Sequence, residues 1–561
     1  MSDAPEQAEP RLGSSDWRWL GALALLPWLL YRAALSFWWA DDDLEILRYL
    51  REHSHLQYLF SPSAWQSLPG SVLTPLQFLS LHFDLALAGM SPGLFHVHQL
   101  TTVSLAALAL YWALRQWWSP GLAGSVATLF LLGRPVASLA AMVPARHYLE
   151  TIALGAAAVV WFRRAVLRGS LAAAWFAAGL SLTAMLFKET AVPLPFALAV
   201  LPVGSWAARR RTLLPQAVAL VLYAVYRFVM LGPELLRGYG FIVPPSELPL
   251  RLLALPGRVA LLFAGPWPWS VAGLLCLAAA LAVLAILRRS SLWLTAWAAA
   301  LALGPIVPVS TDLGERYAVT FWVVAVVTVG AAAHAASLRG GGWKKVGLGL
   351  LAVTLGVFAA LDRAQWRETV DAALRSDAES RALLALGDGD VLRRPVAMGA
   401  FLGELQRYRA EILGVPGTPA WFQDDLALCR GRFAERRLWQ FDDASGAVVD
   451  VSARRDEIRR AACGTVRESG PLAVELELRA EGLFWSLGGG AAGGRYALVF
   501  DDGLRAFDVP ARGGFHLPHP APLRLRVRYI DPSGWSTYSE ELALAGSVGE
   551  RLRWQRPVNQ P

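Results

Sequence analysis

The chain has 561 residues, of which 55% are hydrophobic and 17% are charged. Soluble domains carry about 25% charged residues, so this composition excludes a chain that is soluble over its whole length. The net charge of +8 would also suit a nucleic-acid-binding protein, but the basic residues stand in short clusters between apolar segments, without any nucleic-acid-binding motif. We therefore attribute the basic bias to membrane topology and expect no nucleic-acid partner.

The chain divides into two regimes. Residues 1–361 are dominated by apolar runs, whereas residues 362–561 have ordinary charge density. Runs of roughly 17–25 apolar residues are long enough to cross the ~30 Å hydrocarbon core of a bilayer. After a polar tail, 1–16, we expect a retained anchor and not a cleaved signal peptide. We predict an α-helical polytopic membrane protein with about eleven spans, at 17–39, 94–114, 120–140, 147–164, 169–188, 190–206, 212–231, 271–287, 292–310, 316–337 and 344–361.

Basic clusters give an independent test of this topology. Each of them follows an even-numbered span: Arg115; Arg163, Arg164 and Arg168; Arg209, Arg210 and Arg211; Arg288 and Arg289; Arg339, Lys344 and Lys345. By the positive-inside rule these ends face the cytoplasm. We therefore expect an integral protein of a bacterial inner membrane, with the N-terminus cytoplasmic and residues 362–561 extracytoplasmic.

Two long outer loops are expected, at 40–93 and 232–270. The first contains an amphipathic stretch, 73–87, that is suited to lie flat on the membrane. Within the second, 250–268 is apolar but interrupted by charge and proline, so we expect an interfacial or re-entrant helix there.

The extracytoplasmic part begins as a helical or mixed region, 362–470, and ends in a β-rich module, 471–561. Alternating apolar and polar residues at 472–478 and 523–529 predict strands of a small β-sandwich. Cys429 and Cys463 both lie in this part and are a candidate disulfide if it is extracytoplasmic.

An acidic cluster directly follows the first span. Asp41, Asp42 and Asp43 are adjacent, with Glu45 close behind. Neighbouring carboxylates repel one another, which raises the pKa of at least one of them. One of the three could act as general base on an acceptor hydroxyl, or Asp42 and Asp43 could bind a divalent cation such as Mg²⁺ or Mn²⁺. The alternative is a solvated helix start, where acids complement the helix dipole.

Two cationic motifs fall at the outer ends of later spans. Lys188–Glu189 precedes the sixth span, and Glu315–Arg316–Tyr317 opens the tenth. A lysine beside a glutamate can hold a phosphate, and an arginine can bind one through two hydrogen bonds. The alternatives are a snorkelling ion pair and an ordinary polar cap.

A fourth group flanks the outer turn between the third and fourth spans. Arg134, Arg146, His147 and Glu150 are candidate substrate contacts there, as are Glu45 and Glu315 of the motifs above, although a lone histidine is more often a structural hydrogen bonder. Together the four groups predict an outer cavity at the level of the membrane. A carboxylate in it would deprotonate an acceptor, while cations stabilise a leaving phosphate.

Five stretches occur in an order that resembles a known class: WADDDLEIL, LTPLQFLSLHFDLALAGMSPGLFHVHQL, LFKETAVPLP, GERYAV and AQWRETVDAALRSDAESRALLALG. Over roughly 15–390 the chain resembles the GT-C class of polytopic glycosyltransferases. The nearest likeness is to the transmembrane-and-tetratricopeptide O-mannosyltransferases and their bacterial relatives.

This resemblance implies a polyprenyl-phosphate sugar donor and inversion at the anomeric centre. It places the base among Asp41, Asp42 and Asp43, with Asp42 the first choice, and turns Lys188 and Arg316 toward the donor phosphate.

The chain also departs from this family pattern. Arg134-Pro135 stands where relatives have His-Pro followed by His and Glu, and Ala145-Arg146-His147-Tyr148 where they have Gly-Arg-x-Asp. Thr74 replaces an expected arginine, and the tetratricopeptide array is absent.

The leading hypothesis is thus a cell-envelope glycosyltransferase that acts on a protein, lipid or polysaccharide acceptor. A second hypothesis is a non-catalytic scaffold of GT-C type that binds a lipid-linked glycan or a protein partner. A lipid or glycan transporter is a third, but transporters show inverted repeats and broken midplane helices, whereas the ionisable residues here gather at one face.

Overall fold

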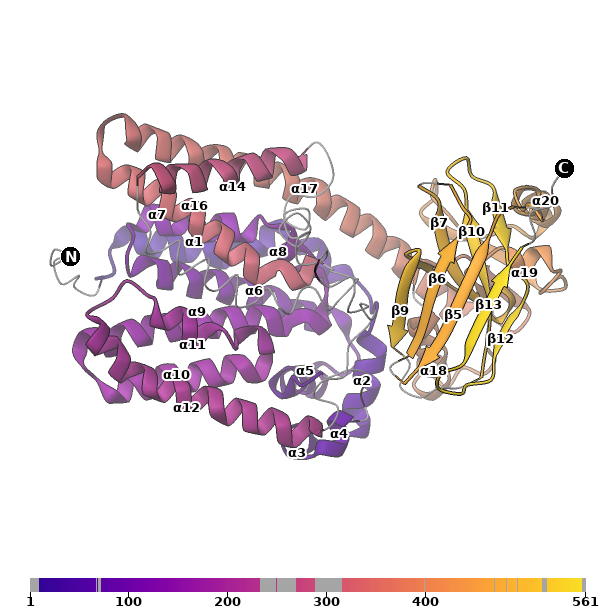
Figure 1. The fold of residues 1–561 in the computed structure, drawn as a ribbon, viewed down its shortest axis with the longest axis horizontal. Helices are drawn as coiled ribbons and strands as arrows, with labels where there is room; N and C mark the ends of the chain where they lie inside the picture. Colours follow the sequence, from indigo (N-terminus) through magenta and orange to yellow (C-terminus); the bar gives the residue numbers. More distant parts are fainter. Residues whose placement is uncertain are drawn as a thin grey trace.

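The computed structural model describes residues 10–232, 249, 269–287 and 315–556, apart from 67, 69–71, 398, 469, 481, 492 and 517–521. The predicted helix 250–268, the span 292–310 and nearly all of the loop 232–270 lie outside these residues. A mostly helical N-terminal part is followed by a C-terminal part rich in strands (Figure 1). The helical part contains α1 (Ser14–Leu30), η1 (Arg32–Ser36), α2 (Asp43–Glu52), α3 (His55–Phe60), α4 (Pro62–Gln66), α5 (Pro75–Ala88), α6 (Pro92–Arg115), α7 (Pro120–Leu131), α8 (Arg134–Ala141), η2 (Val143–Ala145), α9 (Arg146–Arg168), α10 (Leu171–Phe187), η3 (Glu189–Ala191), α11 (Leu194–Ala199), α12 (Trp206–Leu231), α14 (Trp269–Ile286), η7 (Glu315–Ala318), α16 (Val319–Arg339) and α17 (Gly341–Ala385).

Among the described residues, four helical segments are long and apolar enough to cross a membrane: Pro92–Arg115, Trp206–Leu231, Glu315–Arg339 and Gly341–Ala385. The pair α7 and α8 would add a fifth as one span bent by 59°. The bend lies at Gly133, where an added Cβ would meet the Trp322 indole at 2.1 Å. Pro135, in the first turn of α8, lacks an N–H and is therefore suited to restart a helix.

The predicted span 190–206 is wrong as a regular helix. It consists of η3, the six-residue α11 and non-helical chain up to Ser205. Pro193, Pro195 and Pro202 fall in this segment, and proline removes a backbone donor and breaks a helix. The segment still crosses the helical part, because Leu198 and its neighbours reach a cluster with Val166 near the end of α9.

The described basic clusters gather at one end of the helical part. Arg115 forms an ion pair with Asp16 (2.7 Å), and Arg163 lies 5.6 Å from the centre of the Trp117 ring. Arg209 donates to the Val203 carbonyl (2.9 Å), in the segment that returns to the end of α9. We call this the arginine end.

The opposite end, which we call the acidic end, carries the short helices α2 to α5. They share a hydrophobic core that includes Trp39, Leu47 and Trp65. The helix α5 falls on the predicted amphipathic stretch: Phe78 and Leu81 are buried, while Phe83 and Leu87 are exposed. The Tyr226 hydroxyl of α12 donates to the Leu59 carbonyl (3.0 Å), so α12 ends beside these helices.

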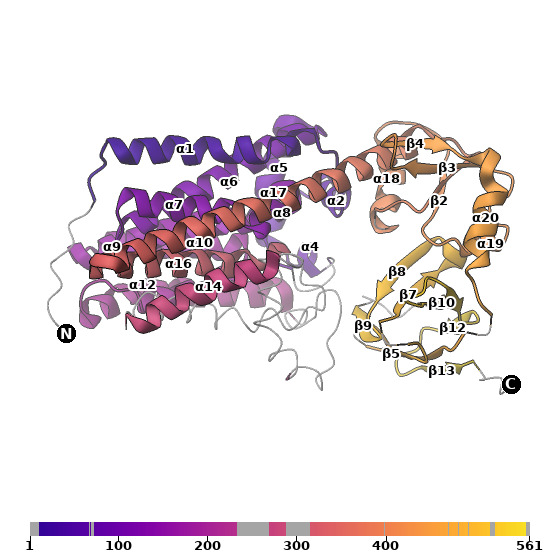
Figure 2. The same cartoon turned by 90° about the horizontal axis from the view of Figure 1, so that it is seen from above.

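The helix α17 joins the two parts of the chain. It has 45 residues and passes without a break through the predicted boundary at 361/362. Figure 2 shows it running from the helical part toward a mixed sheet. This sheet has the order β2-β1-β3-β4, in which β1 is parallel to both β2 and β3. Its elements are β1 (Asp390–Arg393), α18 (Gly399–Glu411), β2 (Ala420–Phe422), α19 (Leu426–Cys429), β3 (Arg437–Asp442), β4 (Ala447–Asp450), η8 (Ser452–Arg454) and α20 (Arg455–Gly464).

A β-sandwich ends the chain, as expected. Its sheets have the orders β13-β5-β6-β9 and β11-β10-β7-β8, with β12 also paired to β10. The two predicted strands correspond to β5 and β10, in which alternate side chains enter the core between the sheets. The elements are β5 (Ala473–Arg479), β6 (Gly482–Gly488), β7 (Arg495–Phe500), η9 (Asp501–Gly503), β8 (Arg505–Val509), β9 (Arg512–His516), β10 (Leu523–Ile530), β11 (Ser536–Tyr538), β12 (Leu542–Leu544) and β13 (Arg551–Gln555).

Candidate functional site

The acidic cluster forms a tight turn, Ala40–Asp43, which we call the acidic turn. The Ala40 N–H donates to the Asp43 carboxylate (2.8 Å), and the Asp43 N–H donates to the Ala40 carbonyl (3.0 Å). Burial raises the pKa of Asp43 well above its ordinary value of 3.8, although the Ala40 N–H opposes this. Asp43 therefore holds the turn together, and its buried carboxyl is poorly placed to meet an acceptor as a base.

Asp41 and Asp42 differ in their surroundings. Asp41 is exposed and has a left-handed backbone, with φ of 48°. Desolvation by the surrounding protein and then the charge of Asp42 raise the pKa of Asp41 above 3.8, while Arg316 lowers it. Asp42 caps the N-terminus of α2 by position, without a side-chain hydrogen bond to the helix. Arg316, which is distant in the sequence, is thus the cation whose charge acts on Asp41.

Glu45 lies one turn further along α2, toward the part of the chain that follows α17, residues 386–556, which we call the outer domain from its expected location. Burial raises its pKa, as do the charges of Asp42 and Glu404, whereas Arg48 and Arg407 oppose this. Because Glu404 and Arg407 belong to α18, Glu45 faces the outer domain.

Lys188 and Arg316 flank a pair of tyrosines. Lys188 forms an ion pair with Glu189 (2.9 Å) and lies 5.5 Å from the centre of the Tyr148 ring. The Tyr148 ring packs edge-on to that of Tyr317, with centroids 6.1 Å apart. Arg316 lies 5.0 Å from the Tyr317 ring centre and donates to its hydroxyl (3.3 Å). The structure therefore brings the two predicted phosphate-binding motifs together.

His147 lies beside the same group. It is buried, its Nδ1 is 3.0 Å from the Pro144 carbonyl oxygen, and both Lys188 and Arg316 act on it electrostatically. In this position it supports the turn that carries Tyr148.

Sequence reasoning missed Arg227. Burial raises the pKa of Glu189, but Lys188 and Arg227 together lower it below its ordinary value of 4.5. Arg227 also donates to the Tyr223 hydroxyl (3.3 Å). It falls inside a predicted span, away from any charged motif, so only its position near the end of that span could have indicated it.

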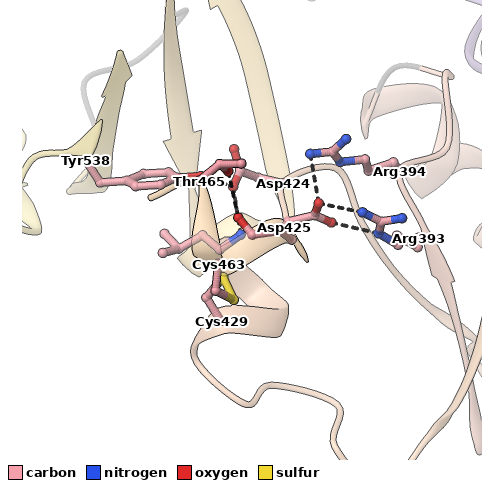
Figure 3. Close-up of a disulfide and its surroundings, with 10 residues drawn as sticks. Arg393, Arg394, Asp424, Asp425, Cys429, Cys463, Thr465 and Tyr538 are labelled. Atoms are coloured by element: carbon pink, nitrogen blue, oxygen red, sulfur yellow. Dashed lines mark hydrogen bonds and ion pairs between the residues drawn. A yellow bond between two sulfur atoms is a disulfide. The ribbon is translucent and has the colours of Figure 1, made fainter. Parts of the chain in front are cut away.

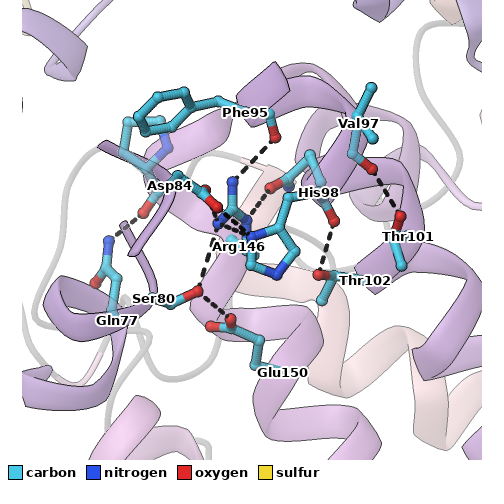
Figure 4. A network of polar contacts seen from close by, with 12 residues as sticks. Gln77, Ser80, Asp84, Phe95, Val97, His98, Thr101, Thr102, Arg146 and Glu150 are labelled. Carbon is cyan, nitrogen blue, oxygen red and sulfur yellow. Dashed lines mark hydrogen bonds and ion pairs between the residues drawn. The ribbon is translucent and has the colours of Figure 1, made fainter. Parts of the chain in front are cut away.

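Arg146, a predicted substrate contact, lies in a buried polar network. It is fully buried and forms an ion pair with Asp84 (Figure 4). It also donates to Gln99 (3.1 Å) and to the Phe95 carbonyl (3.0 Å). The buried acid that neutralises it comes from α5, and the network ties α5, α6 and α9 together.

Two further predicted substrate contacts, Glu150 and Arg134, also bond to other side chains of the protein. Glu150 accepts a hydrogen bond from Ser80 (2.7 Å), at the edge of the Arg146 network. Arg134 forms an ion pair with Glu315, which joins α8 to η7 directly beside Arg316. Both residues thus join elements next to the site: Glu150 contacts α5, and Arg134 contacts η7.

Among the described residues, no three His, Cys, Asp or Glu side chains are grouped so that they could hold one metal ion. One oxygen of the Asp43 carboxylate accepts the Ala40 N–H. The divalent cation expected at Asp42 and Asp43 stays a prediction, and no step proposed below runs through a metal.

The candidate disulfide lies in the outer domain. Cys429 and Cys463 are bonded and connect α19 to α20 (Figure 3). Just before α19, Asp424 pairs with Arg528 of β10 (2.7 Å), and Asp425 pairs with Arg393 of β1 (2.6 Å). The mixed sheet and the sandwich are therefore held at one junction.

No family model and no curated protein matches the chain. Among solved structures it is similar to ArnT from Cupriavidus metallidurans. The apo state has 14% sequence identity and a TM-score of 0.39, over 77% of this chain and 94% of that one. ArnT bound to undecaprenyl phosphate has 15% identity and a TM-score of 0.40, over 73% of this chain and 86% of that one.

Proposed function

We propose that the protein is a membrane glycosyltransferase of the GT-C class, which moves a sugar from a polyprenyl-phosphate donor to a hydroxyl acceptor. The observation that carries the proposal is that Arg316, whose charge acts on Asp41, and Lys188 flank one pair of tyrosines, Tyr317 and Tyr148. Two cations, one of which acts on a carboxylate, at the end of helices that can span a membrane suit a lipid-borne phosphate and an acceptor from the water phase.

Asp41 is the best-placed base of the three aspartates. It is accessible, and its raised pKa brings it closer to neutral pH, where a general base is most effective. Asp41 would take the proton as the acceptor oxygen forms its bond to the anomeric carbon. The bond from that carbon to the phosphate oxygen breaks in the same step, which inverts the anomeric centre.

Arg316 and Lys188 would stabilise the leaving phosphate. The electron pair of the broken bond stays on the phosphate oxygen, so negative charge grows there during the reaction. Fixed cations at that point favour the transition state over the ground state. The Tyr317 and Tyr148 rings hold both cations in place.

The positive-inside rule supports an extracytoplasmic site. The described basic clusters lie at the arginine end, and the acidic turn lies at the opposite end with the outer domain. A donor that is already lipid-linked needs no nucleotide-binding loop, and the sequence has none.

Purified protein in lipid nanodiscs would be given a panel of radiolabelled polyprenyl-phosphate sugars together with envelope extract as acceptor. We expect one donor to be consumed, and Asp41→Asn to slow transfer by roughly 10²–10⁴-fold, the usual contribution of a general base. Glu52→Gln is the matched control, since Glu52 ends the helix that follows the acidic turn and pairs with Arg48. Donor binding without turnover in the unmodified protein would instead favour the scaffold hypothesis.

A further inference from the structure

An arginine-rich surface lies around the disulfide of the outer domain. It is formed by the segment that follows α19 and by α20, which the Cys429–Cys463 bond joins. Arg455 connects the same two segments, because it donates to the carbonyls of Phe433 (2.9 Å) and Arg436. We call this surface the arginine patch, and its members are Arg430, Arg432, Arg436, Arg455 and Arg460.

Within the part of the chain that the structure describes, no acidic side chain forms an ion pair with any of the five arginines. Three nearby arginines do have such pairs: Arg437 with Asp390, Arg454 with Glu457 and Arg459 with Asp456. The segments that form the patch contain three acids: Glu435 is exposed, and Glu457 and Asp456 already pair with Arg454 and Arg459. The five guanidinium groups therefore leave a surplus of positive charge on this face.

An aromatic residue organises the patch. Phe433 has a left-handed backbone, with φ of 64°, which is uncommon for a bulky residue. The guanidinium groups of Arg432 and Arg436 each lie 5.5 Å from the centre of its ring. Two cations on one aromatic ring repel each other unless an anion lies nearby, and the ring restricts the conformations of both side chains.

The position of the patch restricts its partner. In Figures 1 and 2, α19 and α20 lie on the side of the outer domain that points away from the membrane-spanning helices. The headgroups of the protein's own bilayer are therefore on the other side of the domain. A partner must approach from the compartment beyond, which is extracytoplasmic in the orientation proposed above.

We propose that the arginine patch binds an anionic polysaccharide through its carboxylate or phosphate groups. Guanidinium groups bind both kinds of anion through paired hydrogen bonds. Several arginines on one face suit a chain that repeats its charges, and an extracytoplasmic compartment makes a polysaccharide a better candidate than a nucleic acid. This binding takes only its orientation from the proposed transfer reaction and does not depend on that reaction.

The test measures binding of polygalacturonate, a polymer of carboxylated sugars, to the full chain in nanodiscs of zwitterionic lipid. The variant Arg430→Gln/Arg432→Gln/Arg460→Gln changes three exposed members of the patch. The control Arg524→Gln/Arg551→Gln/Arg553→Gln removes equal charge from the sandwich, where each arginine already has an acidic partner. We expect the patch variant to bind roughly tenfold or more weakly, with a smaller dependence on salt, and the control to bind nearly normally.

Other outcomes would overturn the proposal. These are equal losses in both triple variants, unchanged binding in the patch variant, competition by neutral dextran, or equally tight binding of double-stranded DNA with the same response to the substitutions. Because Arg432 also donates to the Asp501 carbonyl, the double variant Arg430→Gln/Arg460→Gln repeats the test without disturbing that contact. Retained glycosyl transfer in the patch variant, with weakened polymer binding, would separate this site from the transfer site.

Discussion

At the scale of single residues, the acidic turn gives three adjacent aspartates different surroundings. Asp43 closes the turn, Asp42 stands at the start of α2, and Asp41 meets the charge of Arg316. Desolvation is the main cause that raises the pKa values of Asp41 and Asp43, and the carboxylate repulsion that the sequence predicted adds to it. The sequence could not predict which residue faces the cations, because a local backbone hydrogen bond and a left-handed residue decide that.

The pH dependence of transfer tests the role of Asp41, because two substitutions should shift it in opposite directions. A base acts in its deprotonated form, so the rate should rise with pH through the raised pKa of Asp41. Since the charge of Asp42 raises this pKa and that of Arg316 lowers it, Asp42→Asn should move the rising limb to lower pH and Arg316→Gln to higher pH. The measurement is kcat/KM against pH, and equal shifts in the same direction would contradict the assignment.

Arg146 and Arg316 should respond differently to substitution. Removing one partner of a buried ion pair leaves an uncompensated charge, at a cost of about 3–5 kcal/mol. Arg146→Gln should therefore lower the thermal stability of the purified protein strongly, because Asp84 stays buried. Arg316→Gln should leave stability nearly unchanged and weaken binding of polyprenyl phosphate. If Arg146→Gln unfolds normally and loses only lipid binding, Arg146 is a ligand-binding residue after all.

The role of Arg146 could not be read from the sequence. Its partner Asp84 lies in the preceding outer loop, inside a stretch that was identified by its amphipathic pattern. Nothing in that pattern shows that the aspartate turns inward. The pairing follows from the packing of α5 on α6 and α9, which is tertiary information.

At the scale of elements, the breaks in the helices position the site. The turn between α7 and α8 places Arg134 at the first position of α8, where it meets Glu315 of η7. Arg316 is the next residue in the chain, so this ion pair holds the segment that presents it. This pair could not be predicted from the sequence, because its members are far apart in the chain.

A double-mutant cycle on Arg134 and Glu315 would measure the interaction energy of this ion pair. Residues in direct contact show interaction energies of about 0.5–3 kcal/mol. We expect Arg134→Gln and Glu315→Gln each to weaken polyprenyl-phosphate binding, and the double variant to be no worse than either single one. Additive losses would mean that the two residues act separately. Unchanged binding in all three variants would mean that the ion pair does not position Arg316.

Proline explains the element that the sequence analysis assigned wrongly. Hydropathy alone made 190–206 a span, but prolines at 193, 195 and 202 interrupt the helix. The two predicted strands were found correctly because a two-residue alternation needs only local sequence. The mixed sheet was missed because its four strands are short and pair in non-sequential order.

At the scale of the whole molecule, the outer domain is packed against the helix that carries the acidic turn. Phe401, Leu402 and Leu405 of α18 share a core with Leu47 and Leu50 of α2. Arg48 of α2 pairs with Glu404 of α18 (2.9 Å). Composition indicated a helical membrane part and a separate folded part, but it contained no information on this contact.

A charge swap would test the docking of the outer domain. Arg48→Glu and Glu404→Arg should each place like charges together and loosen the contact. The double variant should restore it in part, because residue 48 would then face Glu52 and residue 404 would face Arg407. The measurement is the distance distribution between spin labels on α3 and on α20, recorded in nanodiscs. Exposed ion pairs contribute little, about 0–1 kcal/mol, so the expected change is a broader distribution and not dissociation. Narrow, identical distributions in all four proteins would show that the apolar core alone fixes the domain.

The central claim is that Lys188 and Arg316 hold one lipid-borne phosphate group, while a carboxylate of the acidic turn lies beside it to take the proton of the acceptor. The most direct test is a cryo-electron microscopy structure of the protein in nanodiscs that contain polyprenyl phosphate. We predict density for the phosphate between Lys188 and Arg316, with the Asp41 carboxyl facing it. A phosphate bound elsewhere, or an Asp41 that turns away from an occupied site, would contradict the proposed function.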